Sequence, residues 1–444
     1  MYSFKTQDDL KSFDEFVVKN GGSYLQCSSW SGVKTAWKPI FYSGYDGDEM
    51  VLTCLVLRRK LPVAGTVWYI SCGPVCDYQN EQLQKEFAEF IKGEMQKHKA
   101  TCAISDPMIP LRINGEECEQ GKLAHKMLVK YGYTLNKDIE TYTYKHPVQL
   151  FINLKDENGQ AVTGEQILKK CEKGVRYSVR VGKSRGLLAK TYTYDDIEKD
   201  PCIMQDFMSV MEDTSGRNDF VQRDSDYCLN LLKSFKEETD IMLVYYDKQQ
   251  DLKLENERLE KREILEKSLS TAPEKKQRGI REEIDSIDNN TKSFNARCEE
   301  TKDYPQNASI PVAGGLTIRY AGVASCLFGG TRNIVRNNTR SSHYLNYLRI
   351  CKSIDLGCHI HDLGYVLVKT PEVTHDGTLG ELCPADNFVG ICDFKKSMGS
   401  DYYEFIGEYI LVGKKLRFLF YSKIMPSAKK LKMKLIKLIR KIKR

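Results

Sequence analysis

The sequence of 444 residues has no hydrophobic run long enough to cross a lipid bilayer. Its longest uncharged stretch, Leu61–Cys76, contains two prolines, and a membrane-spanning helix needs about 20 apolar residues. The first residues also lack the basic start and apolar centre of a secretory signal. These absences predict a chain that is cytoplasmic or peripheral on a membrane.

The cysteines lack the spacing of a disulfide framework or a metal site. There are 15 of them, an odd number, and no C-x-x-C pair occurs. This pattern is typical of free thiols in a reducing compartment. Two groupings remain, Cys72 with Cys76 and Cys358 with His359 and His361. Such groupings are more often buried thiols and strand histidines than ligands, so we expect no metal.

Strong catalytic motifs are also missing. The sequence contains no G-x-x-x-x-G-K-[ST], G-x-G-x-x-G, H-E-x-x-H or G-x-S-x-G motif. Arg319, Gly322 and Ala324 match the spacing of an acyl-CoA pyrophosphate loop, but they fall at an expected hairpin turn with no helix after it. We therefore expect no bound cofactor.

Charge is distributed unevenly along the chain. The net charge is +7, from 67 basic and 60 acidic residues. Thirteen basic residues and no acidic residue follow Glu408, which leaves a net charge of −6 over residues 1–408. A uniformly basic surface that coats nucleic acid is thereby excluded, whereas a local anionic partner near the C-terminus is not.

The cationic C-terminal segment has the pattern of an amphipathic helix. Residues 429–444 contain nine basic residues in sixteen, and Leu431, Leu435, Leu438, Ile439 and Ile442 fall on one helical face. The segment is too short to span a bilayer and suits the surface of an anionic one. An RNA-binding tail and a helix docked on the acidic body are the alternatives. We assign residues 426–444 to this tail.

Most of the chain alternates strand-like and helix-like runs, which predicts an α/β fold. Residues 247–302 differ, because 27 of these 56 residues are charged. Isoleucines and other residues at 280, 284, 287, 291, 294 and 298 form a heptad seam, and Leu252, Leu259, Leu265 and Leu269 form a looser one. We expect an antiparallel helical hairpin about 40 Å long, with Thr271 capping its second helix.

Four positions carry the types of residue that chemistry needs. Lys34 lies between Trp30 and Trp37, which favours a site for a phosphate or a ring. Asp106 follows an expected strand, where a carboxylate can face a cleft, although a simple turn residue is the more common role. Arg223 and Tyr227, four residues apart, are expected on one helix face. Lys395 follows Phe394 and lies shortly before a turn glycine, Gly399.

Nine short motifs, taken in order, resemble the FemABX family of peptidoglycan-bridge aminoacyltransferases. No single motif is specific, but their number, order and spacing are, and together they cover about residues 1–425. The motifs are YLQxxxWxxVKxxW (24–37), GPVxD (73–77), IxDP (104–107), RxxFxxRxxxY (217–227), PxAGGLxI (311–318), FGGT (328–331), HDLG (361–364), FKKxxG (394–399) and YxFIGEY (403–409).

The resemblance implies two acetyltransferase-like (GNAT-like) domains. The first covers residues 1–150 and is completed by about 406–425; the second covers 151–246 and 308–405; the helical arm at 247–302 is inserted in it. The arm is thought in the family to meet tRNA. The implied reaction moves an amino acid from aminoacyl-tRNA to a stem-peptide amine of lipid II or UDP-MurNAc-pentapeptide. Because the tRNA ester is already activated, no cofactor is needed.

The resemblance also implies roles for individual residues. Lys34, Arg223 and Tyr227 are expected to bind the phosphate and sugar oxygens of the precursor. Lys395 is expected to stabilise the oxyanion of the tetrahedral intermediate, and Asp106 to orient the acceptor amine or take its proton. The rings of Trp37 and Phe328 are expected to line the substrate site.

The sequence departs from the family pattern at the aromatic pair, here Cys326 and Phe328, and at Tyr365, which replaces a glycine and narrows the expected acceptor cleft. Two alternatives therefore stay open: an N-acyltransferase that uses acyl-CoA or modifies proteins, and a degenerate scaffold that binds tRNA or membranes. The transferred amino acid and any homologous aminoacyltransferase partner are also open.

Overall fold

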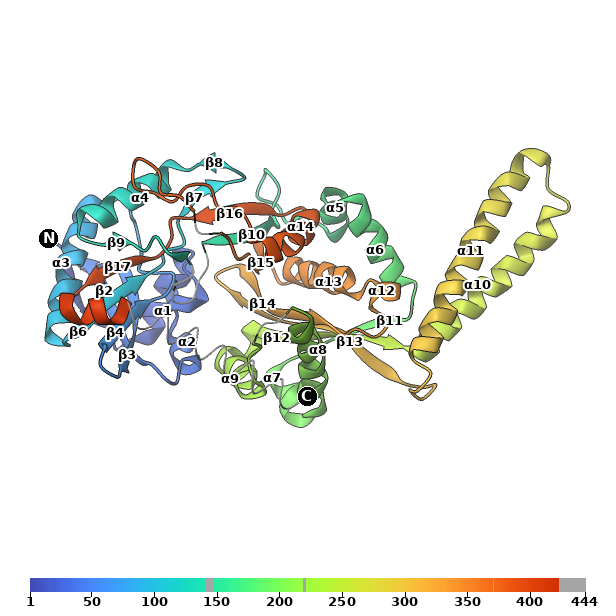
Figure 1. Cartoon of the computed structure of the whole chain (residues 1–444), viewed down its shortest axis with the longest axis horizontal. Coiled ribbons are helices and arrows are strands. Elements are labelled where there is room, and N and C mark those ends of the chain that lie inside the picture. The colour runs from blue at the N-terminus through green and yellow to red at the C-terminus, as the bar shows by residue number, and fades with distance from the viewer. Residues whose placement is uncertain (140–141, 143–146, 219–220, 370, 423–444) are drawn as a thin grey trace.

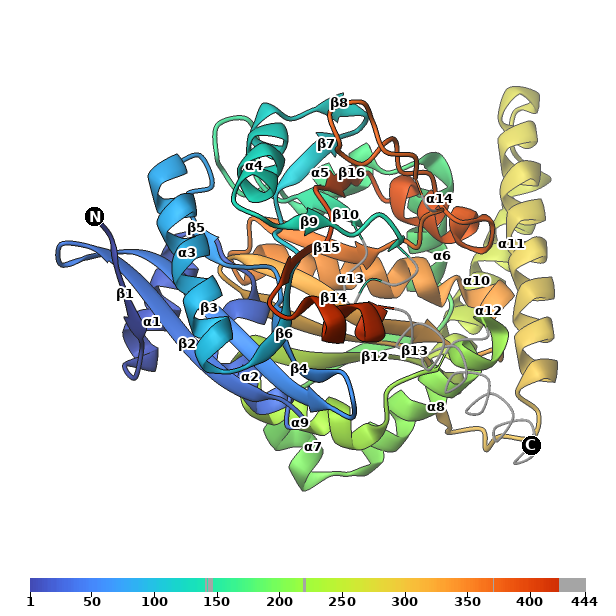
Figure 2. The same ribbon diagram turned by 60° about the vertical axis from the view of Figure 1, so that its left-hand side comes forward.

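The computed structural model describes residues 1–139, 142, 147–218, 221–369 and 371–422. Two β-sheets lie side by side, and a pair of long helices projects from the end of the second sheet as a separate rod (Figures 1 and 2). Within the described residues, no helix combines the length and the apolar character needed to cross a membrane. The cationic segment 426–444 lies outside the described residues.

The first sheet has the strand order β1-β2-β3-β4-β6-β17-β9, with β5 paired to β3. Its central strand β3 is buried continuously from Leu52 to Leu57, because helices cover both faces of the sheet. Helix α3 (Glu81–Lys97) covers one face, and α1 (Leu10–Lys19) covers the other. The strands are β1 Ser3–Thr6, β2 Lys38–Asp46, β3 Glu49–Leu61, β4 Gly65–Ile70, β5 Val75–Cys76, β6 Ala100–Ser105, β9 Thr134–Leu135 and β17 Tyr409–Val412.

The second sheet has the strand order β11-β12-β13-β14-β15-β10-β16-β7-β8. Helices cover both of its faces, and the apolar residues of these layers form the core. Its strands are β7 Pro110–Ile113, β8 Glu116–Glu117, β10 Val148–Asn153, β11 Leu187–Tyr192, β12 Thr239–Asp247, β13 Ser309–Tyr320, β14 Val323–Thr331, β15 Ile360–Tyr365 and β16 Asp401–Phe405. The remaining helices of the body are α2 Ser28–Val33, α4 Glu119–Lys130, α5 Gly164–Lys170, α6 Lys173–Lys183, α7 Tyr194–Lys199, α8 Cys202–Asn218, α9 Ser225–Phe235, α12 Arg336–Thr339, α13 Ser341–Asp355 and α14 Val389–Ser397.

Both sheets repeat one topological unit, a parallel strand pair joined by a crossing helix. In the first sheet α3 connects β4 to β6, and in the second α13 connects β14 to β15. The parallel pairing of β14 with β15 covers only Val323–Ser325 and Ile360–Asp362, so the two strands separate beyond it. The predicted fold class, α/β with acetyltransferase-like domains and an inserted helical arm, is confirmed.

Each half of the chain contributes a strand to the other sheet. β7, from the N-terminal third, pairs with β16 in the second sheet, and β17, from the C-terminal end, lies between β6 and β9 in the first. A shared apolar core also joins the halves, where Trp30 of α2 packs near Phe235 of α9. The two sheets therefore form one continuous body.

The arm consists of α10 (Lys248–Leu269) and α11 (Glu274–Glu300). All six predicted seam positions of α11 are buried or half-buried, as expected. On α10 the prediction holds for Leu265 and Leu269 but is wrong for Leu252 and Leu259, which are exposed. The basal half of the α10 seam is instead formed by charged residues, Asp251, Glu255, Arg258 and Arg262.

A buried ion pair fixes the base of the arm. Asp251 and Arg297 are both fully buried and form two hydrogen bonds of 2.7 and 2.8 Å. Tyr246 donates a third hydrogen bond to Asp251, and Lys248 donates to the carbonyl of Thr301. Because a buried charge without a partner is costly, these contacts specify one register and one direction of the arm.

One further sequence expectation is wrong in detail. Helix α11 begins after Pro273, and the predicted cap Thr271 does not serve it. The basic stretch over residues 165–181 forms two helices, α5 and α6. The thiol of Cys171 donates to the carbonyl of Met398, and the amide of Glu172 donates to that of Ser397, which holds the backbone between the helices in an extended conformation.

Candidate active site

Lys34 lies at the C-terminal end of α2, against two aromatic rings. Its ammonium nitrogen is 4.6 Å from the centroid of the Trp30 ring and 5.7 Å from that of Tyr227. Desolvation, together with the smaller effect of the nearby positive charge of Arg223, lowers the pKa of Lys34 to about 8. A desolvated cation held against rings, with a second cation beside it, favours an anionic ligand.

A buried glutamine supports this part of the site. The side-chain amide of Gln26 donates to the carbonyl of Ser71 at 2.6 Å, and its oxygen accepts from the amide of Leu55 at 2.9 Å. These bonds join the short helix Tyr24–Gln26, which precedes α2, to β3 and to the end of β4. A Cβ atom at Gly73 would lie 2.4 Å from Gln26, so only glycine fits at that position.

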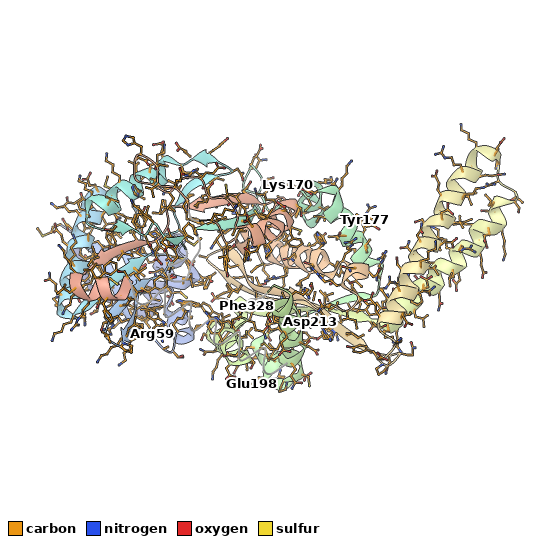
Figure 3. The ribbon with its side chains drawn as sticks, in the orientation of Figure 1. Arg59, Lys170, Tyr177, Glu198, Asp213 and Phe328 are labelled. Atoms are coloured by element: carbon orange, nitrogen blue, oxygen red, sulfur yellow. The ribbon has the colours of Figure 1, made fainter. Side chains whose placement is uncertain are left out.

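Arg223 and Tyr227 complete the anion-binding group from the second half. Asp224 caps α9 by accepting from the amide of Tyr227, so Arg223 lies just before the helix and not on its face as expected. The two side chains nevertheless meet, with the guanidinium carbon 4.8 Å from the Tyr227 ring centroid. Phe328 packs edge-on against Tyr227 at 6.3 Å and lies near the junction of the two sheets (Figure 3).

Lys395 lies on α14, beside the point where β14 and β15 separate. Its ammonium group donates to the carbonyls of Gly364 at 2.9 Å and Tyr365 at 2.8 Å. Burial lowers the pKa of Lys395 to about 8, an effect that the negative charge of Asp362 partly opposes. An ammonium has three donors, so these two hydrogen bonds leave one donor for a reacting oxygen.

Tyr365 connects the anion-binding group to Lys395. Its carbonyl accepts from Lys395, and its half-exposed side chain is close enough to Arg223 for that cation to oppose the rise in the Tyr365 pKa caused by burial. Tyr24 adds a second connection: burial raises its pKa, and the neighbouring Cys72, Asp362 and Tyr227 raise it further. The site therefore combines residues of both halves.

Asp106 is buried at the end of β6. Its carboxylate accepts from the hydroxyl of Tyr69 at 2.5 Å and from the amide of Cys72 at 2.6 Å. It borders a crevice of about 10 Å³, which it shares with Met108 and Phe405; this is about the space of one water molecule. These contacts hold the ends of β4 and β6 in place.

Trp37 lies next to this region, 6.4 Å from the Tyr69 ring and 5.8 Å from the guanidinium carbon of Arg59, which Figure 3 marks on the first sheet. Sequence reasoning gave no role to Tyr24, Gln26 or Asp362. Each lies in a quoted motif, but no local pattern distinguishes a buried polar side chain that links two elements from an exposed one.

The cysteine and histidine groupings have ordinary hydrogen-bond partners. His361 lies 2.9 Å from the hydroxyl of Ser353 and 3.2 Å from the thiol of Cys326. Burial lowers the pKa of His361 to about 3, which keeps it neutral. No cluster of three or more metal-ligating side chains occurs in the part of the chain that the structure describes, and all 15 cysteines are free thiols.

Known proteins resemble this chain over nearly its full length. The model of the FemAB family matches residues 9–425. The aminoacyltransferase FemA of Staphylococcus aureus strain MRSA252 is 23% identical over 384 residues, which cover 82% of this chain and 84% of FemA. FemA of strain MW2 is 22% identical over the same span.

A solved structure agrees with these matches. The crystal structure of FemX superposes with a TM-score of 0.71 at 19% identity and covers 95% of this chain and 99% of that one. The arrangement of two sheets is thus a known fold, and the predictions of family and of an enzyme of the transferase class are confirmed. The chain belongs to the FemAB family.

Proposed function

We propose that the chain transfers an aminoacyl group from aminoacyl-tRNA to the stem-peptide amine of a peptidoglycan precursor, a step that builds the interpeptide bridge. One observation carries the proposal. In a member of the FemAB family, a desolvated cationic group made of Lys34, Arg223 and Tyr227 lies next to a half-buried lysine, Lys395, at the point where two strands separate.

The cationic group suits the diphosphate of the precursor. Lys34 supplies a point charge, and Arg223 a planar fork that matches two phosphate oxygens. The phenol of Tyr227 lies between them and can donate to a phosphate or sugar oxygen. Phe328 adds apolar surface beside Tyr227, and Trp37 adds more beside Tyr69, which suits the ring faces of a sugar or base.

The transfer step needs a neutral acceptor amine and a stabilised oxyanion. The amine nitrogen attacks the ester carbonyl, a C–N bond forms, and the C–O bond to the tRNA ribose breaks after the tetrahedral intermediate. The free donor of Lys395 stabilises the oxyanion. Because the pKa of Lys395 is about 8, it is also suited to give a proton to the leaving ribose oxygen near neutral pH.

Asp106 fits a positioning role better than that of a general base. Its two hydrogen bonds stabilise the carboxylate, and the adjacent crevice has no room for an amine-bearing peptide. We therefore assign to Asp106 the task of holding the strand ends that carry the acceptor side of the site. The proton of the attacking amine then passes to solvent or to the leaving oxygen.

The charge distribution favours lipid II over the soluble UDP-linked precursor as the acceptor. Thirteen basic residues follow Glu408, and a cationic amphipathic segment would bring the enzyme to the anionic inner leaflet. Sedimentation with anionic vesicles, with and without residues 426–444, tests this. Equal binding by both forms would exclude the segment as a membrane contact.

The decisive assay incubates the protein with a mixture of charged tRNAs and either lipid II or UDP-MurNAc-pentapeptide. The mass of the precursor afterwards identifies the amino acid and the number added. A mass increase that disappears after ribonuclease treatment is expected. Unmodified precursor with every charged tRNA would refute the proposal, and a product that requires acyl-CoA would favour the alternative acyltransferase.

A matched pair of variants tests the role of Lys395. Lys395→Ala should lower the transfer rate by about 10²–10³-fold, the typical effect of losing one oxyanion donor, without weakening precursor binding. The neighbouring Lys396 is exposed and lies 4.8 Å from the Tyr402 ring. Lys396→Ala should keep the wild-type rate. Equal rates for both variants would remove Lys395 from the mechanism.

A further inference from the structure

A basic surface covers the end of the body that faces the arm. Its cations lie on α5, on α6, and on the segment that leads through α12 into α13. All are exposed, and none takes part in an ion pair among the described residues. We call this the α6 surface; it comprises Lys169, Lys170, Lys173, Arg180, Lys183, Arg336 and Arg340.

Other arginines of the same region have structural roles. Arg176 donates to the carbonyls of Lys169 and Cys171 and so closes the end of α5. Arg217 donates to the carbonyl of Thr331 at 2.7 Å. The fold thus uses some of the local cations as internal donors and leaves the α6 surface without such partners, which is expected of a surface reserved for an external anion.

Nearby acids offset only part of the positive charge of the surface. Glu300 accepts from the amide of Val335 and the side chain of Asn338. Asp213 accepts from the amide of Asn333. Desolvation lowers the pKa of Arg217, and the positive charge of Arg336 lowers it as well. Glu165 and Glu172 are also exposed, at the starts of α5 and α6. These four acids are fewer than the seven cations, so the surface keeps a net positive charge.

Helix α6 places an exposed aromatic ring within the row of cations. Tyr177 is 53% exposed, and Lys173 and Arg180 lie four residues before it and three residues after it on the same side of the helix. Lys183, also exposed, lies at the end of the row, 5.6 Å from the centroid of the Tyr347 ring of α13. Figure 3 shows Tyr177 and Lys170 on the side of the body that faces the arm. The row is about 15 Å long. Lys, Arg and Tyr side chains are the donors that bind the phosphates and 2′-hydroxyls of an RNA stem.

One helix connects this surface to Lys395. Gly182 of α6 packs so closely on Tyr344 of α13 that a Cβ atom there would lie 2.8 Å from the ring. At the start of the same helix, His343 lies 4.9 Å from Phe394, the residue before Lys395. Figure 1 shows α14, α13, α12 and α6 in succession between the centre of the body and the arm.

We propose that the α6 surface docks the phosphate backbone of an RNA stem whose aminoacylated 3′ end reaches Lys395. This inference rests on the proposed function and adds the location of the RNA. The arm itself is a poor source of attraction, since residues 247–302 contain 13 basic and 14 acidic residues. The arm flanks the bound stem, and the α6 surface supplies the charge.

Binding of uncharged tRNA to the full-length protein, measured over a range of salt, tests the surface without any chemistry. A plot of log affinity against log salt has a negative slope, and the triple variant Lys173→Ala/Arg180→Ala/Lys183→Ala should make this slope shallower by about 2 to 3. Each lost phosphate contact contributes about 0.9 to the slope. Tyr177→Ala should weaken binding about fivefold or more, because it removes a hydrogen bond from the phenol to a charged phosphate. The control variant Lys60→Ala/Lys85→Ala/Lys126→Ala removes three exposed lysines of the first half and should bind as wild type.

A second substrate separates this inference from the proposed function. A short aminoacylated RNA that comprises only the 3′ end does not reach α6, so the triple variant should use it as well as wild type does, while its KM for full-length charged tRNA rises. Equal tRNA affinity of the triple and control variants would overturn the α6 surface. So would a loss of anionic-vesicle binding with tRNA binding intact. If wild type uses neither RNA, the proposed function fails instead.

Discussion

The pKa of Lys34 predicts that affinity for the precursor falls as pH rises through about 8. The desolvated ammonium is charged below that pH and neutral above it. About nine-tenths of the lysine is charged at pH 7 and about one-tenth at pH 9, so the affinity that depends on this charge falls about ninefold. The diphosphate is fully ionised throughout this range, so the lysine dominates the change.

Titration calorimetry with UDP-MurNAc-pentapeptide from pH 6.5 to 9.5 measures this effect. Lys34→Arg keeps a charge at every pH and should remove the inflection while retaining binding. Lys34→Gln should bind weakly at every pH. An inflection that persists in Lys34→Arg, or a flat profile for wild type, would refute the assignment of the anion site to Lys34.

The same shift has a consequence for stability, and its sign is opposite to that of binding. The pKa is near 10.5 in the unfolded chain and about 8 in the folded one, so the unfolded state binds more protons between these values and stability rises with pH there. Below pH 8 the desolvation cost is fully present. Lys34→Met should therefore stabilise the protein at pH 7 by about 1–3 kcal/mol and lose this gain above pH 10.5.

Three further predictions concern the framework. Asp251→Asn leaves a buried guanidinium unpaired and should cost about 3–5 kcal/mol, visible as faster amide hydrogen exchange in both arm helices; unchanged exchange would contradict the buried pair. Gly73→Ala forces a Cβ against a buried glutamine and should lower stability by about 1–3 kcal/mol, whereas Gly93→Ala, with nothing within 4 Å, should raise it by about 0.5–1 kcal/mol in the same thermal melt. Leu259→Ser on the exposed side of α10 should change stability by less than about 0.5 kcal/mol, and Leu265→Ser by more; equal effects in urea titrations would contradict the observed seam.

Local patterns predicted what is local in this fold. The period of 3.5 residues gave the complete seam of α11, because its positions carry apolar or small side chains. The same rule failed on the basal half of α10, where charged residues form the seam. Asp251 and Arg297 lie 46 residues apart, and nothing in the sequence near either marks them as partners.

The prediction of the site depended more on the order of motifs along the chain than on any rule of residue spacing. Lys34 and Tyr227 are 193 residues apart and meet only because α2 and α9 share a core. The sequence showed the chemical type of each residue, but it did not show which groups surround that residue in the fold. Asp106 has the position of a base in the sequence, and only the fold reveals that the hydroxyl of Tyr69 and an amide occupy it.

The strands that each half contributes to the other sheet, β7 and β17, affect how the chain folds while it is being synthesised. The first sheet lacks an internal strand until residues 409–412 insert between β6 and β9. Until these residues have been synthesised, the facing edges of β6 and β9 stay unpaired. Exposed edges of this kind are prone to aggregation. Residues 110–113 wait similarly for β16. Because each half supplies a strand to the sheet of the other, we expect the chain to depend on chaperones during synthesis. We also expect neither half to fold when it is expressed alone.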